Sequence, residues 1–140
     1  MLVHATTIDL AGAGVMILGV SGAGKSELAL RLIHEGALLV CDDQTELEAL
    51  GASWIARAPE PIAGLLEVRG VGIVRVATKS QTTVRLVVKL TADAAERMPE
   101  PGTWCPPACQ GPAIPAVLLQ SGETSLPAKL RSALLSVLYQ

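Results

Sequence analysis

One nine-residue segment limits the fold of this chain more than any other. It reads GVSGAGKSE at positions 19–27, directly after the apolar run Val15–Leu18 and before the leucine- and alanine-rich stretch Leu28–Ile33. It fits the pattern G-x-x-x-x-G-K-[ST] and lies between a strand and a helix, the context that the pattern requires. Glycines let successive backbone amides turn inward around an anion, and the helix start adds partial positive charge. The segment therefore predicts a phosphate-binding loop in an α/β fold.

Each residue of this loop has an expected task. Lys25 can reach the outer phosphates of a triphosphate or pyrophosphate, and the Ser26 hydroxyl is a natural ligand for Mg²⁺. The alternative is a glycine-rich turn with a chance lysine, which the flanking strand and helix disfavour. The residues expected to bind the phosphates are Gly19, Val20, Ser21, Gly22, Ala23, Gly24, Lys25, Ser26 and Glu27.

The pattern of apolar residues organises the rest of the chain around the loop. Strands are expected at 4–10, 15–20, 37–43, 45–50, 53–58, 65–77, 82–90 and 114–120, helices at 23–35 and 127–138, and a proline-rich loop at 98–115. The 82–90 strand alternates, with Val84, Leu86, Val88 and Leu90 inward and Arg85 and Lys89 outward. The last helix buries Leu130, Leu134 and Leu138, with Ser125 as its candidate cap.

Two buried strands joined by a helix form a βαβ unit, and buried strands indicate a covered sheet. With 140 residues, the chain is expected to fold as one domain over 1–140. We therefore predict an α/β fold: a phosphate-loop-containing mixed sheet, a helix after the loop and a C-terminal helix.

Two acids follow the loop after a single helix. Asp42 and Asp43 end the next strand, so both are expected beside the phosphates at the carboxyl edge of the sheet. A pair allows a division of labour in which one acid holds Mg²⁺ and the other accepts a proton from an attacking hydroxyl. The alternative is a solvated strand end with two ordinary surface acids.

A third group of candidates lies in the segment GLLEVRGVGIV. Glu67 and Arg69 are expected to share one face of a strand. Together they could serve a metal and a phosphate, or they could form a simple cross-strand ion pair. The residue types alone leave both readings open.

Composition disfavours several other classes of protein. A net charge of −2 without a basic run disfavours a nucleic-acid partner, and no apolar run is long enough to span a bilayer. The N-terminus lacks a signal-peptide pattern, and three cysteines cannot all pair within the chain, so a cytoplasmic location is expected. Cys105 and Cys109 invite a zinc reading, which the two prolines between them and the lack of a second pair of ligands disfavour.

With these residues in place, the chain resembles the catalytic domain of HPr kinase/phosphorylase, the bacterial enzyme family that phosphorylates a serine of the phosphocarrier protein HPr. The resemblance is carried by His4, the loop GVSGAGKSE, the doublet in LLVCDD and the segment LLEVRGVGIV. These pieces come in the family's order within residues 4–76. The tail SLPAKLRSALLSVL resembles the last helix of the family's short forms.

The resemblance implies ATP and Mg²⁺ as cofactors and HPr as the partner. It implies that Lys25 contacts the transferred phosphate and that Ser26 and Asp43 lie at Mg²⁺. Asp42 would be the catalytic acid/base that activates the target serine, with His4 close enough to influence its protonation. Family members assemble as hexamers, so a homo-oligomer is also expected.

Glu67 and Arg69 would line the active site, Glu67 as a further metal ligand and Arg69 as a catalytic residue. The chain also departs from the longer family members. It begins almost at their catalytic domain, and Leu118, Leu119 and Gln120 stand where they carry arginines tied to the reverse, phosphate-dependent reaction. Kinase activity is therefore expected more than phosphorylase activity. The alternatives are a small-molecule P-loop kinase, related to the P-loop carboxykinases, and a non-catalytic nucleotide-sensing module.

Overall fold

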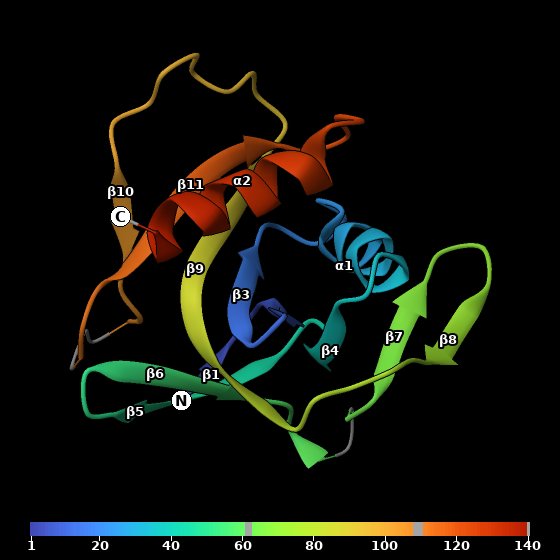
Figure 1. Cartoon of the computed structure of the whole chain (residues 1–140). Helices are drawn as coiled ribbons and strands as arrows, with labels where there is room; N and C mark the ends of the chain where they lie inside the picture. The colour runs from blue at the N-terminus through green and yellow to red at the C-terminus, as the bar shows by residue number, and fades with distance from the viewer. Residues whose placement is uncertain (61–62, 108–110, 140) are drawn as a thin grey trace.

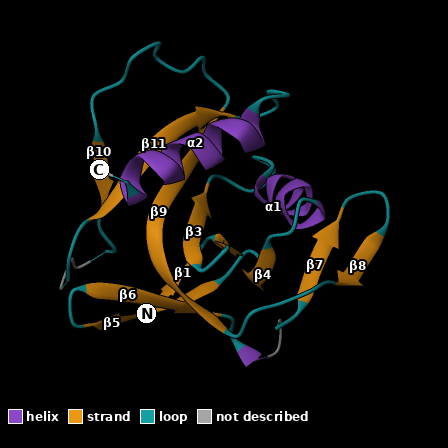
Figure 2. Cartoon of the chain, viewed as in Figure 1, coloured by secondary structure: helices purple, strands orange, loops and turns teal. Residues whose placement is uncertain are grey.

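The protein folds into a strongly curled mixed sheet with two helices on one face (Figures 1 and 2). The computed structural model describes residues 1–60, 63–107 and 111–139. The elements are β1 (Leu2–Val3), β2 (Thr6–Leu10), β3 (Ala13–Leu18), α1 (Lys25–His34), β4 (Leu38–Cys41), β5 (Thr45–Leu50), β6 (Ser53–Arg57), β7 (Leu65–Val68), β8 (Gly72–Arg75), β9 (Gln81–Thr91), β10 (Gly102–Trp104), β11 (Ile114–Gln120) and α2 (Leu126–Leu138).

Strand β9 connects the parts of the sheet. Its first residues pair antiparallel with β6, its middle pairs parallel with β3, and its last residues pair parallel with β11. The path β1-β5-β6-β9-β3-β2-β4 is continuous, while β10 extends β11 and the β7–β8 hairpin stands apart. Because β3, β9 and β11 run in the same direction, their carboxyl ends meet at one edge of the sheet.

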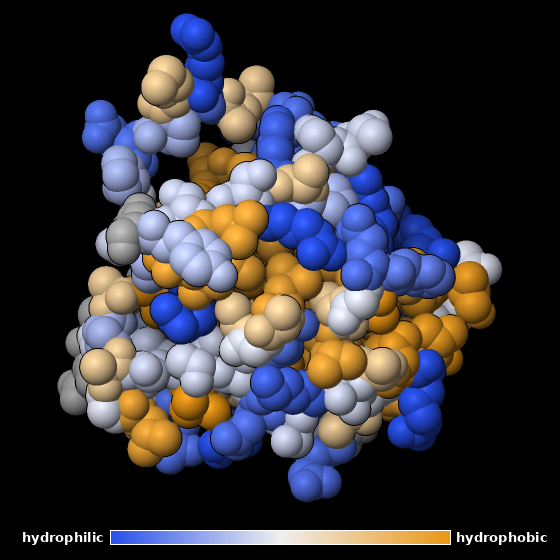
Figure 3. Space-filling model, viewed as in Figure 1, coloured by the Kyte–Doolittle hydropathy of each residue, from blue (hydrophilic) through white to orange (hydrophobic). Residues whose placement is uncertain are grey.

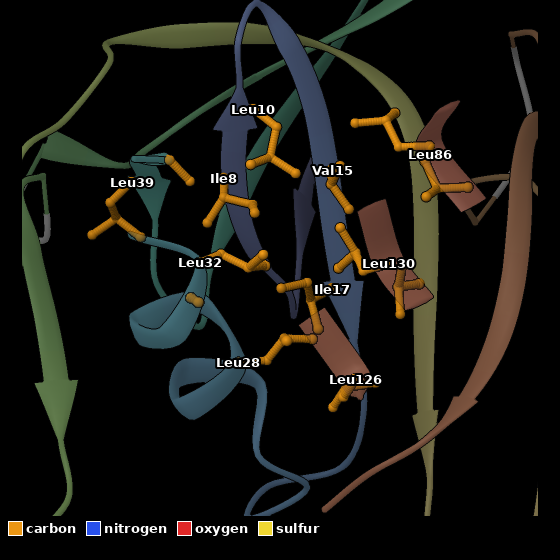
Figure 4. Close-up of a cluster of buried hydrophobic side chains, with 14 of the residues drawn as sticks. Ile8, Leu10, Val15, Ile17, Leu28, Leu32, Leu39, Leu86, Leu126 and Leu130 are labelled. Carbon is orange, nitrogen blue, oxygen red and sulfur yellow. The ribbon is translucent and has the colours of Figure 1, made fainter. Parts of the chain in front are cut away.

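Apolar side chains fill both faces of this sheet. The larger cluster lies between the sheet and the two helices, where Ile8, Ile17, Leu32, Leu86 and Leu130 are fully buried (Figure 4). Burying one such side chain contributes roughly 1.5–3 kcal/mol to folding. A second cluster on the other face contains Trp54, which supplies one of the chain's few aromatic rings.

The α/β class is confirmed, with one change in its central unit. Strands β3 and β4 are connected by α1 as expected, but β2 lies between them and pairs antiparallel with both. The two connected strands are thus parallel to each other and one strand apart. Their carboxyl ends still lie at the same edge, so the phosphate loop and the two acids are brought together.

The boundaries around the loop differ from the prediction for a conformational reason. Strand β3 ends at Leu18, not at residue 20, and α1 begins at Lys25, not at residue 23. Gly22 and Gly24 have φ angles of 82° and 99°, which lie outside the right-handed helical region. The chain therefore needs the whole 19–24 segment to turn before the helix starts.

The expected single strand over 65–77 is wrong. The segment folds as the hairpin β7–β8, with Gly70 and Gly72 at φ angles of 86° and 120° and the Val71 amide bonded to the Val68 carbonyl at 3.0 Å. Arg69 consequently lies in the turn and not on the same strand as Glu67. Apolar surface covers this hairpin in Figure 3, and Val71 is 74% exposed.

Smaller corrections concern three other segments. The strand expected over 4–10 begins only at Thr6 as β2, the short β1 precedes the predicted range, and β10 forms inside the loop predicted for 98–115. In β9, the outward-facing Arg85 occupies an irregularity in the register with β3, which turns Val84 toward the second core cluster while Leu86 faces the first. Val84 and Leu86 are both buried as predicted, but on opposite faces.

The C-terminal helix forms as predicted with Leu130 and Leu134 buried in it, but Leu138, also expected to be buried, is only partly buried. Ser125 occupies the cap position, but its side chain makes no capping hydrogen bond. Among the residues that the structure describes, neither helix combines the length and apolarity needed to cross a membrane.

Candidate active site

The 19–24 loop curls around the side chain of the first residue of α1. Lys25 is only 6% exposed, and its Nζ donates to the carbonyl oxygens of Gly19 at 2.8 Å and Val20 at 3.2 Å. The loop tip points outward, with Val20 79% exposed. The lysine side chain is therefore enclosed by a loop whose tip is open to solvent.

Asp42 lies buried next to this loop. Its Oδ1 accepts hydrogen bonds from the hydroxyls of Ser26 at 2.6 Å and Thr6 at 3.0 Å, and its Oδ2 accepts from the Glu67 amide at 3.2 Å. The carboxyl group is held from both sides by α1, β2 and β7. All three donors are uncharged.

Asp43 faces a different direction from Asp42. Its backbone has a φ angle of 66°, and its side chain is 58% exposed. One carboxylate oxygen lies 3.1 Å from Nε2 of His4, and the Asp43 amide donates to the Thr6 hydroxyl at 3.1 Å. The left-handed backbone therefore separates the two acids into a buried one beside Ser26 and an exposed one beside His4.

The direct contacts differ from the arrangement that the resemblance implied. It implied that Ser26 and Asp43 lie at Mg²⁺ and that His4 lies close to Asp42, whereas the direct contacts in the structure join His4 to Asp43 and Ser26 to Asp42. The reason is the turn after β4, which reverses the direction in which consecutive side chains point.

The structure brings Glu67 to the site through its backbone, and its side chain is exposed. Arg69 is exposed in the hairpin turn, and the structure assigns it no contact with either acid. Thr6 was missed by sequence reasoning, although it contacts both acids. Its only signal was a β-branched residue near the start of a strand, which equally describes a core position.

The thiol of Cys41, next to the site, is buried in the protein. Cys41 is fully buried directly before Asp42 and lies 2.8 Å from the Thr45 hydroxyl. Burial raises the pKa of the Cys41 thiol, which favours its neutral form.

The donor set fits a hard divalent cation. Asp42 is 9% exposed, and among the described residues no basic nitrogen forms an ion pair with it. A buried carboxylate without a countercharge is costly, and a cation bound by Asp42 and the Ser26 hydroxyl would compensate it. The zinc reading of Cys105 and Cys109 is not tested, because Cys109 lies outside the described residues.

This edge of the sheet defines a class: an α/β protein that places a phosphate-loop motif against a pair of aspartates. Comparison with known proteins narrows the class. Residues 1–100 match the family model described as the HPr Serine kinase C-terminal domain. The chain belongs to this family.

Individual relatives agree with the family match. HPr kinase/phosphorylase of Clostridium beijerinckii is 45% identical over 75 residues, which cover 54% of this chain and 25% of that protein. HPr kinase/phosphorylase 1 of Oceanobacillus iheyensis is 42% identical over 96 residues, covering 63% of this chain and 31% of that protein. The matched part of this chain thus spans about a quarter to a third of these relatives' length.

A solved structure extends the likeness to nearly the whole chain. The Hpr(Ser) kinase/phosphatase from Coxiella burnetii superposes with a TM-score of 0.82 at 28% sequence identity. The match covers 97% of this chain and 89% of that one. The likeness therefore includes α2, which lies beyond the residues matched by the family model.

Proposed function

We propose that this chain is an ATP- and Mg²⁺-dependent protein-serine kinase that phosphorylates HPr. The observation that carries the proposal is the 2.6 Å hydrogen bond between Ser26 and Asp42, because it joins the phosphate loop to the paired acids. Family membership supports a kinase, and the printed names of the relatives support HPr as the substrate.

The Ser26 hydroxyl and the Asp42 carboxylate are the proposed ligands of Mg²⁺. Both are hard oxygen donors of the kind that this ion prefers. Glu67 stays a candidate further ligand, because its amide contacts the same carboxylate. When bound, the ion neutralises charge on the phosphates during transfer.

Asp43 is the proposed acid/base, in place of Asp42. It is exposed where a protein substrate can approach, and His4 lies 3.1 Å from it and can orient its carboxylate. In the kinase direction, the serine oxygen forms a bond to the γ-phosphorus while the bond to the bridging oxygen breaks. ADP leaves with that electron pair, and Asp43 takes the hydroxyl proton.

Lys25 is proposed to hold the transferred phosphate. Its Nζ now donates to the Gly19 and Val20 carbonyls, so the ammonium is already held within the loop. A fixed positive charge at this point stabilises the charge that develops on the phosphoryl oxygens. Positioning of the two reactants supplies the remaining acceleration.

The experiment incubates the protein with labelled ATP, Mg²⁺ and HPr, beside an HPr variant that lacks the target serine. We expect label on HPr only, and a loss of at least 100-fold in Lys25→Ala, a size typical of lost charge stabilisation. Lys89→Ala, which removes an exposed lysine of β9, is the matched control and is expected to retain activity.

Other outcomes point to the alternative functions. Retained ATP binding without label on HPr would favour a nucleotide-sensing module, while label on a small hydroxyl compound but not on HPr would favour a metabolite kinase. Undiminished transfer to HPr by Lys25→Ala would contradict the proposal. Self-assembly, which the resemblance implies, is measured on the same samples by light scattering.

A further inference from the structure

We propose that the groove between α1 and α2 binds the nucleoside end of the nucleotide. This inference rests on the proposed function, because it assumes that a triphosphate occupies the 19–24 loop. In this inference, a part of the molecule that includes His34 and the start of α2 recognises the nucleoside half of the nucleotide.

The position of the acids sets the direction of the nucleotide. Asp42 and Asp43 follow β4, which lies on one side of β3, and β9 and β11 lie on its other side. The reacting phosphate must face the acids, so the nucleoside must extend away from them, toward β9 and β11. A Cβ added to Gly19 would lie 3.5 Å from the Leu90 side chain, so the loop already touches the end of β9.

Helix α2 covers this side of the sheet, because it packs on β9 and β11. Its first turns lie beside α1 (Figure 1). One face of α1 leads from the loop to this place. Glu27, Arg31 and His34 recur at helical spacing, so they follow one another along the same face. From Ser26 to Arg31 the helix rises only about 7.5 Å.

A groove opens where this face meets α2. It is lined by Leu30, Arg31 and His34 of α1 and the adjoining Glu35, together with Thr124, Pro127 and Ala128, and its volume is about 460 Å³. This size lies within the range of small-ligand sites, which combine apolar walls with a few polar groups. Leu30, Pro127 and Ala128 offer apolar walls to a flat base, while Thr124 and His34 offer polar groups.

The far wall of the groove is fixed before any ligand binds. Arg31 donates through Nη2 to the Thr124 carbonyl at 2.8 Å and through Nη1 to the Glu123 carbonyl at 3.4 Å. Lys129 forms an ion pair with Glu123 at 2.8 Å, and the Ser121 amide donates to the Thr91 carbonyl at 2.8 Å. The 121–125 turn is thereby tied to both helices and to β9, so little ordering is needed on binding.

The test compares two ligands that differ only in the nucleoside. Binding of ATP and of inorganic tripolyphosphate, each with Mg²⁺, is measured by calorimetry for the unchanged protein and for Ala128→Trp, which fills the groove. We expect ATP affinity to fall at least 10-fold and tripolyphosphate affinity to stay within 2-fold, because loss of a well-filled pocket costs this much or more. Ser136→Trp, an exposed position two turns further along α2, is the control.

Each outcome has one meaning. Unchanged ATP affinity in Ala128→Trp, or an equal loss for both ligands, overturns the inference. If Ala128→Trp does not fold, His34→Ala and Thr124→Ala replace it, with the same selective loss of ATP affinity expected. If the unchanged protein binds neither ligand, the proposed function fails instead, so the two failures are distinguishable.

Discussion

Two buried aspartates, near opposite ends of β2, differ in how the protein compensates their negative charge. Asp9 is 3% exposed and accepts hydrogen bonds from Thr82 at 2.6 Å, from the Gly12 amide at 2.9 Å and from Lys79 at 3.1 Å. Asp42 is nearly as buried, but its donors are two hydroxyls and an amide.

The difference lies in the countercharge. Lys79 balances Asp9 within the protein, while among the described residues Asp42 has hydrogen-bond donors only. Burial alone would raise the pKa of Asp9, but the bonds from Thr82, Gly12 and Lys79 outweigh it and hold the pKa below its usual value. The charge of Asp9 is thus compensated within the protein, whereas Asp42 is the carboxylate that we propose as a ligand of Mg²⁺.

The largest effect is expected for a substitution of Asp42. Asp42→Asn removes the charge but keeps the shape, so we expect phosphoryl transfer to HPr to fall about 10³-fold, a size typical of lost electrostatic stabilisation, because the proposed Mg²⁺ site loses its carboxylate. The melting temperature should stay the same or rise, because a buried uncompensated charge is lost. Steady-state kinetics and thermal melts check both parts.

Asp43→Asn is the companion variant. It should also lose transfer, because the proposed proton acceptor is gone, but it should keep Mg²⁺-dependent ATP binding. Full activity in either variant would contradict the proposed roles.

A smaller effect is expected at Asp9. Asp9→Asn should lower the free energy of unfolding by about 2 kcal/mol, the size typical of hydrogen bonds to a charged group. The Thr82 bond carries most of this loss, because it ends on the Oδ2 atom that the amide replaces, whereas Oδ1 can still accept from the Gly12 amide. Lys79 is 42% exposed, so water screens its ion pair. Urea unfolding measures the loss, and transfer activity at low temperature should remain. A variant as stable as the unchanged protein would show that the Asp9 cluster contributes nothing.

The smallest expected effect is the pH dependence of the stability that Asp9 contributes. The pKa of Asp9 is lower in the folded protein than its value of about 3.9 in an unfolded chain. Its contribution is therefore present above pH ~4 and is lost as the pH falls through the folded pKa. The stability difference between the unchanged protein and Asp9→Asn should stay constant near neutral pH and shrink below pH ~4. A difference that grows on acidification would reverse the sign of this argument.

The phosphate loop, α1 and the position of the acids could be predicted because their signals are local. A glycine pattern, a helical repeat and a strand end are each contained in a few neighbouring residues. The Asp9 cluster could not be predicted, since Asp9 and Lys79 are 70 residues apart and meet only through the sheet. The hairpin over 65–75 was missed because its apolar alternation reads equally well as one strand, although Gly70 and Gly72 marked the turn.

The contacts of the two acids could not be predicted from the sequence for a different reason. Which of them faces Ser26 depends on the backbone of Asp43, at a φ angle of 66° that a non-glycine residue rarely adopts. Residue type alone does not encode that angle. The same limit applies to Thr6, whose contacts with both acids arise only when β2 lies beside β4.

The central place of β9 has a consequence for synthesis on the ribosome. Strand β3 carries the phosphate loop, and one of its two neighbours in the sheet is made more than 60 residues later. Until residues 81–91 emerge, one side of β3 has no partner, so the nascent chain exposes an unpaired apolar edge. The strand that carries the phosphate-loop motif thus gains its second neighbour only late in translation, after residues 81–91 have emerged.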